Sequence, residues 1–245
     1  MLNTTLKRPA IAMLELIFAI VVMGIVLMSA PMLISTSTKS GFVAIQQEAI
    51  HEAASHLNMI MGYHWDENDA DERYVDPILQ VTSGNGDLDE DGNTGRRLGT
   101  PEESYRAFIR SDGTDDLAAS ALATFGAADG TETEKDDIDD FSGNTDLTEI
   151  DTAVADNVEK TTININAVVA YIPDTPGSGS YADPGADNKI TFTPNFTANS
   201  GTSTNIKRIT VTLTSTSGVT ELDKQIILHA FSCNIGGYTL AERGF

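Results

Sequence analysis

The chain of 245 residues is long enough for one or two domains with a buried core. Its 36 acidic and 15 basic residues give a formal net charge of -21. Because nucleic-acid binding by counterion release needs a basic surface, this charge excludes DNA and RNA as expected partners. Cys233 is the single cysteine, so we expect the fold to rest on packing or a bound ion rather than on disulfides or a zinc ribbon.

The charge divides the chain into an apolar start, an acidic middle and a neutral end rich in Thr and Ser. Residues 63–160 contain 27 of the 36 acidic residues, whereas residues 161–245 contain 6. These shifts in composition predict separate structural roles for the three regions.

An apolar run extends from Ile11 to Ile34 and contains one ionisable side chain, Glu15. As a helix it would be about 36 Å long, enough to cross a hydrocarbon core of about 30 Å. A cleaved secretory signal is the alternative, but its apolar region would span only about 7–15 residues. Lys7 and Arg8 precede the run, and this basic flank predicts that the N-terminus is cytoplasmic and that the rest of the chain lies outside.

Glu15 is unusual because a carboxylate at mid-bilayer costs about 2.5–3.5 kcal/mol on insertion scales and generally has a partner. The alternative is a side chain close enough to the interface to stay hydrated. Its position, five residues into the apolar run and between two leucines, favours a specific role.

The segment KRPA followed by IAMLEL resembles the start of type IV pilin precursors and of the pseudopilins of type II secretion systems. The shared pattern is a short basic leader, a small residue before the cut, an apolar residue after it and a Glu as fifth residue of the mature chain. The resemblance implies a leader at residues 1–10, cleaved by prepilin peptidase between Ala10 and Ile11, with methylation of the new amine. Ala10 and Ile11 depart from the Gly and Phe that are usual at these positions.

The resemblance also implies a function and a location. Glu15 of one subunit would pair with the N-terminal amine of its neighbour during assembly. We therefore expect a structural subunit, a minor pilin or pseudopilin, in the bacterial inner membrane. It would cross the bilayer once, with its C-terminal part periplasmic or extracellular in a filament, and its partners would be other subunits and an inner-membrane assembly platform. The alternative is a membrane-anchored periplasmic, calcium-dependent binding module that does not polymerise.

The helix is predicted to continue beyond the membrane to about residue 62. One apolar face recurs at three- and four-residue steps in the amphipathic half, residues 35–62, and is formed by Phe42, Ile45, Ala49, Ala53, Leu57 and Ile60. We expect a β-sheet to cover this face.

The acidic middle, residues 63–160, contains GNGDLDEDGNTG, which matches the first half of an EF-hand calcium loop. Asp87, Asp89 and Asp91 alternate and would converge on a calcium ion. Leu98 stands where the bidentate Glu belongs, so Glu102 or Glu103 would have to complete the site. The competing interpretation is an ordinary acidic turn.

Short helices are predicted after this loop, one capped by Thr100 and one from Leu117 to Phe125. Residues 127–160 have little periodicity and are expected to form a solvated loop. Strands are predicted in the final region, 161–245, at residues 161–172, 189–193, 206–214 and 219–231.

These elements predict an α+β fold: a long N-terminal helix packed under a C-terminal antiparallel β-sheet, with an acidic, loop-rich insertion. No G-x-S-x-G elbow or phosphate-binding loop is present, and Cys233 has no nearby His signature. We therefore do not expect an enzyme.

Overall fold

The computed structural model describes residues 8–70, 76–101, 104, 106–108, 116–126, 135–147, 162–183, 185, 189–193, 196–216 and 223–237. Residues 1–7 of the expected leader lie outside this set. The chain forms two compact units, Met1–Glu48 and Ala49–Phe245, and we call the second unit the head.

Helix α1 extends from Arg8 to Ile60, which confirms the predicted long helix. It is long and apolar enough to cross a membrane. Hydroxyl groups within or near its apolar part bond to carbonyls of the preceding turn: Ser29 Oγ donates to Val26 O at 2.9 Å, and Thr36 Oγ1 donates to Met32 O at 2.9 Å. These bonds satisfy both hydroxyl groups within the helix.

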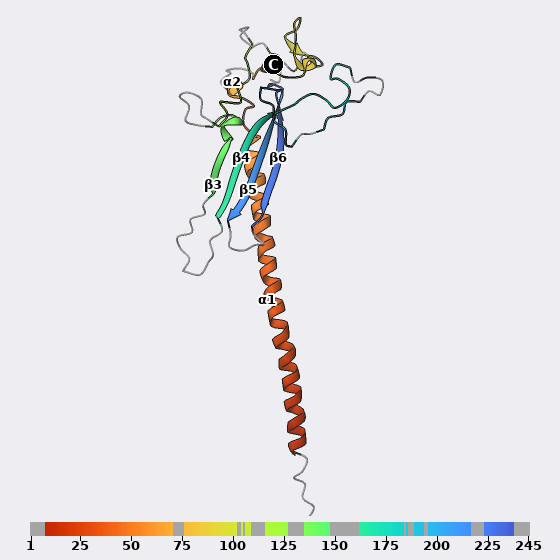
Figure 1. Ribbon diagram of the computed structural model, residues 1–245, viewed down its shortest axis with the longest axis vertical. Helices are drawn as coiled ribbons and strands as arrows, with labels where there is room; N and C mark the ends of the chain where they lie inside the picture. The colour runs from red at the N-terminus through yellow and green to blue at the C-terminus, as the bar shows by residue number, and fades with distance from the viewer. Residues whose placement is uncertain are drawn as a thin grey trace, which may run out of the picture. The chain divides into compact units, whose positions relative to one another are not determined.

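Four antiparallel strands form the sheet of the head, in the order β3-β4-β5-β6 (Figure 1). They are β3, Gly143–Leu147; β4, Thr162–Ile172; β5, Ile206–Thr216; and β6, Gln225–Cys233. The two longest strands pair along their whole length, from Thr162 opposite Thr216 to Ile172 opposite Ile206. The predicted strand at 161–172 and the predicted hairpin are thus confirmed where the structure describes them.

The core of the head lies between the last turns of α1 and one face of the sheet. From α1 it includes Ala49, Ala53 and Ile60, with Leu57 packed against them. From the sheet it includes alternate residues of two strands: Ile165, Ala167, Val169 and Tyr171 of β4, and Ile209, Val211 and Leu213 of β5. The predicted α+β arrangement is confirmed, because the helical stripe from Ala49 to Ile60 and the strand alternation meet in one core. Its expected continuation at Ile45 is wrong, since that side chain is 41% exposed.

Part of the acidic middle belongs to this core, so the prediction of a solvated loop over 127–160 is wrong for residues 135–147. Strand β3 pairs with β4 at the sheet edge, and the short 3-10 helix η3, Asp139–Phe141, precedes it. Ile138 and Phe141 are buried. Backbone pairing with β4 makes Gly143–Leu147 a strand, although Gly, Asn and Asp are depleted in strands.

The predicted helix from Leu117 to Phe125 is also wrong. Gln80 N donates to Leu117 O at 2.7 Å and Ala119 N donates to Gln80 O at 2.8 Å, so the start of this segment pairs with residue 80, and residues 122–126 form turns. Its apolar side chains still pack against the core, including Leu122 and Phe125.

Two further local predictions differ from the structure. After Thr100 the described residues contain no α-helix, since Phe108 N donates instead to Gly95 O at 2.9 Å. The expected strand at 189–193 is reduced to one bridge between Thr191 and Ser178. The described acidic middle does hold the helix α2, Glu67–Ala70, and the 3-10 helix η1, Gly86–Leu88.

A polar network joins the acidic middle to the end of the sheet. Asn234, directly after β6, accepts a hydrogen bond from Leu79 N at 3.0 Å and donates one to Leu79 O at 2.7 Å. Arg97 belongs to a small hairpin of β1, Glu90–Asp91, and β2, Arg96–Arg97, and donates to Asn205 Oδ1 at 2.8 Å. These contacts are specific because they are buried and directional, and they hold the insertion on the sheet.

Candidate functional site

The apolar part of α1 is uncovered on every side. Large apolar side chains between Met13 and Ile34 have exposed fractions from 50% at Val22 to 84% at Met28. A contiguous apolar surface of this size marks a site of contact with lipid or protein. The helix alone therefore leaves a surface that requires an apolar environment.

Glu15 lies on this apolar surface with an exposed side chain. The described residues show no hydrogen bond or ion pair for Glu15. Ala10 and Ile11 lie within the first turns of α1, but their side chains are outside the described set. Glu15 follows Ile11 by four residues, so the two positions share one face of the helix.

The structure places Asp87 in η1, Asp89 at its end and Asp91 in β1. Two of these carboxylates already accept hydrogen bonds from backbone N–H groups. Asp87 Oδ2 accepts from Tyr181 N at 2.9 Å, and Asp91 Oδ1 accepts from Asn93 N at 3.1 Å. Glu102 and Glu103, proposed to complete the loop, lie outside the described residues.

Another acidic group does bring its oxygens together. In the described part of the chain, Glu67, Asp136 and Asp140 form a group whose carboxylate oxygens all lie within 4.8 Å of one another, whereas Asp87, Asp89 and Asp91 form none. Asp140 also accepts a hydrogen bond from Asp136 N at 3.2 Å. Calcium binding by the three aspartates stays a prediction.

The most concentrated charge in the head surrounds Lys207, a residue of β5 whose side chain is fully buried. Its Nζ donates to Trp65 O at 2.6 Å, to Asp66 Oδ2 at 2.9 Å and to Asp139 Oδ1 at 2.5 Å. These three acceptors match the three N–H bonds of an ammonium group. The ammonium is thus satisfied without water.

Aromatic rings enclose the same nitrogen. Lys207 Nζ lies 4.4 Å from the ring centroid of Trp65, 5.0 Å from that of Phe125 and 5.5 Å from that of Tyr171. Desolvated cations are stabilised over aromatic faces, so the rings stabilise the charge while excluding solvent.

Four buried carboxyls accompany this single lysine: Asp66, Asp69, Asp137 and Asp139. Burial, together with the negative charges of Asp76 and Asp66, raises the pKa of Asp69 to about 8. Burial, and then the charge of Asp139, raise the pKa of Asp137 to about 8. At neutral pH these two carboxyls are therefore largely protonated, which limits the negative charge that the core must hold.

The sequence alone does not identify this cluster, although the position of Lys207 in the strand pattern indicates that its side chain is buried. Lys207 is in phase with Ile209, Val211 and Leu213, so the alternation that predicts their burial also places the lysine on the core face. Its partners come from distant segments, and no local spacing identifies them.

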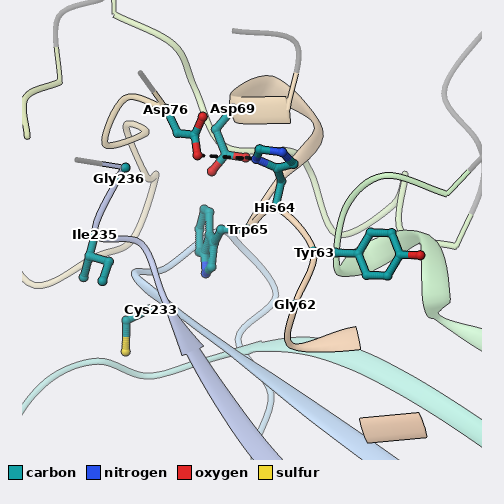
Figure 2. A pocket seen from close by; sticks show the side chains of 10 residues that line it. Gly62, Tyr63, His64, Trp65, Asp69, Asp76, Cys233, Ile235 and Gly236 are labelled. Carbon is teal, nitrogen blue, oxygen red and sulfur yellow. Dashed lines mark ion pairs between the residues drawn. The ribbon is translucent and has the colours of Figure 1, made fainter. Parts of the chain in front are cut away.

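A polar cavity of about 260 Å³ lies beside the cluster (Figure 2). His64 Nδ1 lies 3.4 Å from Asp76 Oδ2, and the ring of Trp65 contributes to both the cavity wall and the surroundings of Lys207. Cys233, an exposed residue, also lines the cavity.

Comparison of the chain with protein-family models, with curated proteins and with solved structures gave no match.

Proposed function

We propose that this protein is a structural subunit, a minor pilin or pseudopilin, of a bacterial filament of the type IV pilus or type II secretion kind. It would be made as a precursor, held in the inner membrane by α1 with its head in the periplasm, and moved into the filament by an assembly platform. Lipid and the helices of other subunits would successively cover the apolar surface of α1.

The observation that carries the proposal is Glu15. It is the single ionisable side chain between Ile11 and Ile34, it lies on an exposed apolar helix, and it shares a face with position 11. Such groups inside membranes generally have a partner of opposite charge. A lone anchor has no need of one.

Cleavage before Ile11 would create that partner in a neighbouring subunit. Transfer of a helix from lipid into a bundle buries its new N-terminal amine, and an unpaired buried charge is strongly unfavourable. Pairing of the amine with Glu15 of the adjacent subunit neutralises both charges. This pairing also sets the axial position of one subunit relative to the next.

The shape of α1 supports the same role. Its apolar part is continuous with the turns that carry Ala49, Ala53 and Ile60 into the core of the head. A subunit built this way keeps its folded head attached to the segment that enters the bundle.

Processing gives the first test. Mass spectrometry of the protein purified from membranes of cells that contain prepilin peptidase should find a mature chain that begins at a methylated Ile11. An Ala10→Glu variant, which replaces the small residue before the cut by a large acidic one, should remain unprocessed in the same membranes. Intact leader on the unmodified protein in those cells would contradict the proposal.

A further inference from the structure

The contact between Lys207 and Asp139 joins an amine to a carboxyl group in a buried site. Both side chains are buried, Lys207 completely, and Nζ lies 2.5 Å from Asp139 Oδ1. A nucleophile and an electrophile held at this distance have the proximity that accelerates reaction between bound groups.

Condensation requires the neutral forms of both groups. These forms arise by transfer of one proton from the Lys207 ammonium to the Asp139 carboxylate, which are in direct contact. This transfer gives a neutral amine with a free lone pair and a neutral carboxylic acid. In accord with this, burial raises the pKa of Asp139 from its ordinary value, although the charge of Lys207 opposes the shift.

Asp66, the other carboxylate on Lys207, is a poorer electrophile. It accepts hydrogen bonds from Ser120 N at 3.0 Å, from Ser120 Oγ at 2.8 Å and from Tyr171 Oη at 3.3 Å. These donors occupy both oxygens of Asp66, whereas Asp139 Oδ1 lies closer to Nζ, at 2.5 Å against 2.9 Å for Asp66 Oδ2. The reactive partner is therefore Asp139.

Asp137 provides a proton relay beside the reacting pair. Its side chain is buried and shares a side-chain hydrogen bond with Asp139. Oδ1 accepts from Asp140 N at 3.0 Å, which fixes the carboxyl group at the start of η3. An un-ionised carboxyl in this position can donate a proton to a leaving hydroxyl group and receive one from an amine.

We propose that Lys207 and Asp139 condense to form an intramolecular isopeptide bond. The lone pair of Nζ forms a bond to Cγ of Asp139, and the C–OH bond of the carboxylic acid breaks. Asp137 protonates the departing hydroxyl group and takes one proton from Nζ, so that one water is released and Asp137 is unchanged. The ion pair already contains every atom of the amide and the water, and no oxidant, reductant or other reactant is required.

The bond would link η3 to β5 across 68 residues of sequence. It would fix the acidic middle covalently to the sheet and leave the head unable to extend fully when pulled or denatured. This inference concerns the head alone and does not depend on the proposed assembly of α1.

Peptide mapping of the full chain, purified in detergent, tests the bond. Trypsin should release a branched peptide in which residues 136–160 are joined to residues 190–208, with a mass one water below the sum of the two. Fragmentation should place the link between Asp139 and Lys207. Recovery of unlinked peptides 136–160 and 190–207 from the folded, unmodified protein would overturn the proposal, and so would a link from Lys207 to peptide 40–73, which carries Asp66.

Two variants separate the roles. Lys207→Arg keeps a buried cation but lacks the condensing amine, so its digest should contain no branched peptide. Asp137→Asn keeps the acceptor for Asp140 N but cannot relay a proton, so the branched fraction should fall at least tenfold at equal times after synthesis. An undiminished branched fraction in Asp137→Asn would overturn the relay.

Discussion

Lys207 lies on a face of β5 whose following residues are the apolar Ile209, Val211 and Leu213. A buried charge is tolerated only when it is paired and hydrogen-bonded, and here three acceptors and three aromatic rings satisfy that condition. The lysine draws together segments near residues 66 and 139, which contain most of the buried acids. The buried polar groups of the head are thus organised around the side chain of Lys207.

Removal of this side chain should be strongly destabilising. Lys207→Met deprives the buried Asp66 and Asp139 of their shared partner, and the free energy of unfolding of the head should fall by about 3–5 kcal/mol. Thermal denaturation of the full chain in detergent measures the loss. Lys189→Met, at an exposed loop position, is the matched control and should change the stability by less than about 0.5 kcal/mol. Equal stability of the two variants would contradict the described role of Lys207.

The raised pKa of Asp69 predicts a pH dependence of stability. Its pKa moves from an ordinary 3.8 to about 8 in the fold, so between these values the folded state binds more protons than the unfolded chain. The contribution of Asp69 is therefore fully present below pH 4 and is lost as the pH rises through 8. Between pH 5 and 8 it should decrease by an amount on the order of 2 kcal/mol.

The variant Asp69→Asn imitates the protonated carboxyl and should flatten this profile. The melting temperature measured from pH 5 to pH 8 should fall less in Asp69→Asn than in the unmodified chain. Asp183→Asn, which changes an exposed carboxyl, should keep the unmodified slope. Identical slopes for Asp69→Asn and the unmodified protein would show that Asp69 is ionised throughout this range.

At the scale of elements, the insertion is held by polar contacts as well as by packing. Asn234 bonds to both backbone groups of Leu79, and Asp174 accepts hydrogen bonds from Asn205 Nδ2 at 2.7 Å and from Asn85 N at 2.9 Å. Buried groups that lose such partners are costly, so each bond specifies where the acidic segment lies. The insertion contains only short strands, short helices and turns, so it has little regular secondary structure to hold it in place.

Loss of the Asn234 side chain should release the insertion locally. In Asn234→Ala the backbone N–H and C=O of Leu79 lose their partners, which should cost about 1–3 kcal/mol. Amide hydrogen exchange over residues 77–82 should accelerate by about tenfold or more, while exchange in β4 and β5 changes little. Asn93→Ala, in an exposed turn, is the control, and accelerated exchange of the whole head in both variants would contradict this view.

The elements that could be predicted from the sequence are those whose buried side chains are apolar and recur with the period of a helix or a strand. The stripe Ala49, Ala53, Leu57 and Ile60 and the alternation of β4 and β5 follow from helix and strand periods. Strand β3 has no such pattern, because pairing with its neighbour forms it. The segment from 117 to 125 has the composition of a helix, but tertiary pairing with Gln80 overrides that preference.

At the scale of the whole molecule, the two compact units have different requirements. The head buries a core in which helix, sheet and charged cluster are mutually satisfied. The unit that ends at Glu48 instead leaves nearly all of its apolar side chains exposed. This first unit is long and apolar enough to cross a membrane, and on the proposed function lipid or neighbouring helices would cover it.

Glu15→Leu tests the pairing mechanism most directly. The substitution makes the helix more apolar, so membrane insertion becomes easier, and any loss of function must arise in assembly. Glu48→Leu makes the same change beyond the apolar run of α1 and serves as the control. Both variants would be produced beside the unmodified subunit and followed by cross-linking and shear fractionation.

We expect Glu15→Leu to be processed, to accumulate in the inner membrane and to be at least tenfold depleted from sheared, cross-linked filaments relative to Glu48→Leu. Incorporation of Glu15→Leu equal to that of the unmodified subunit would contradict the pairing of Glu15 with a neighbour's amine.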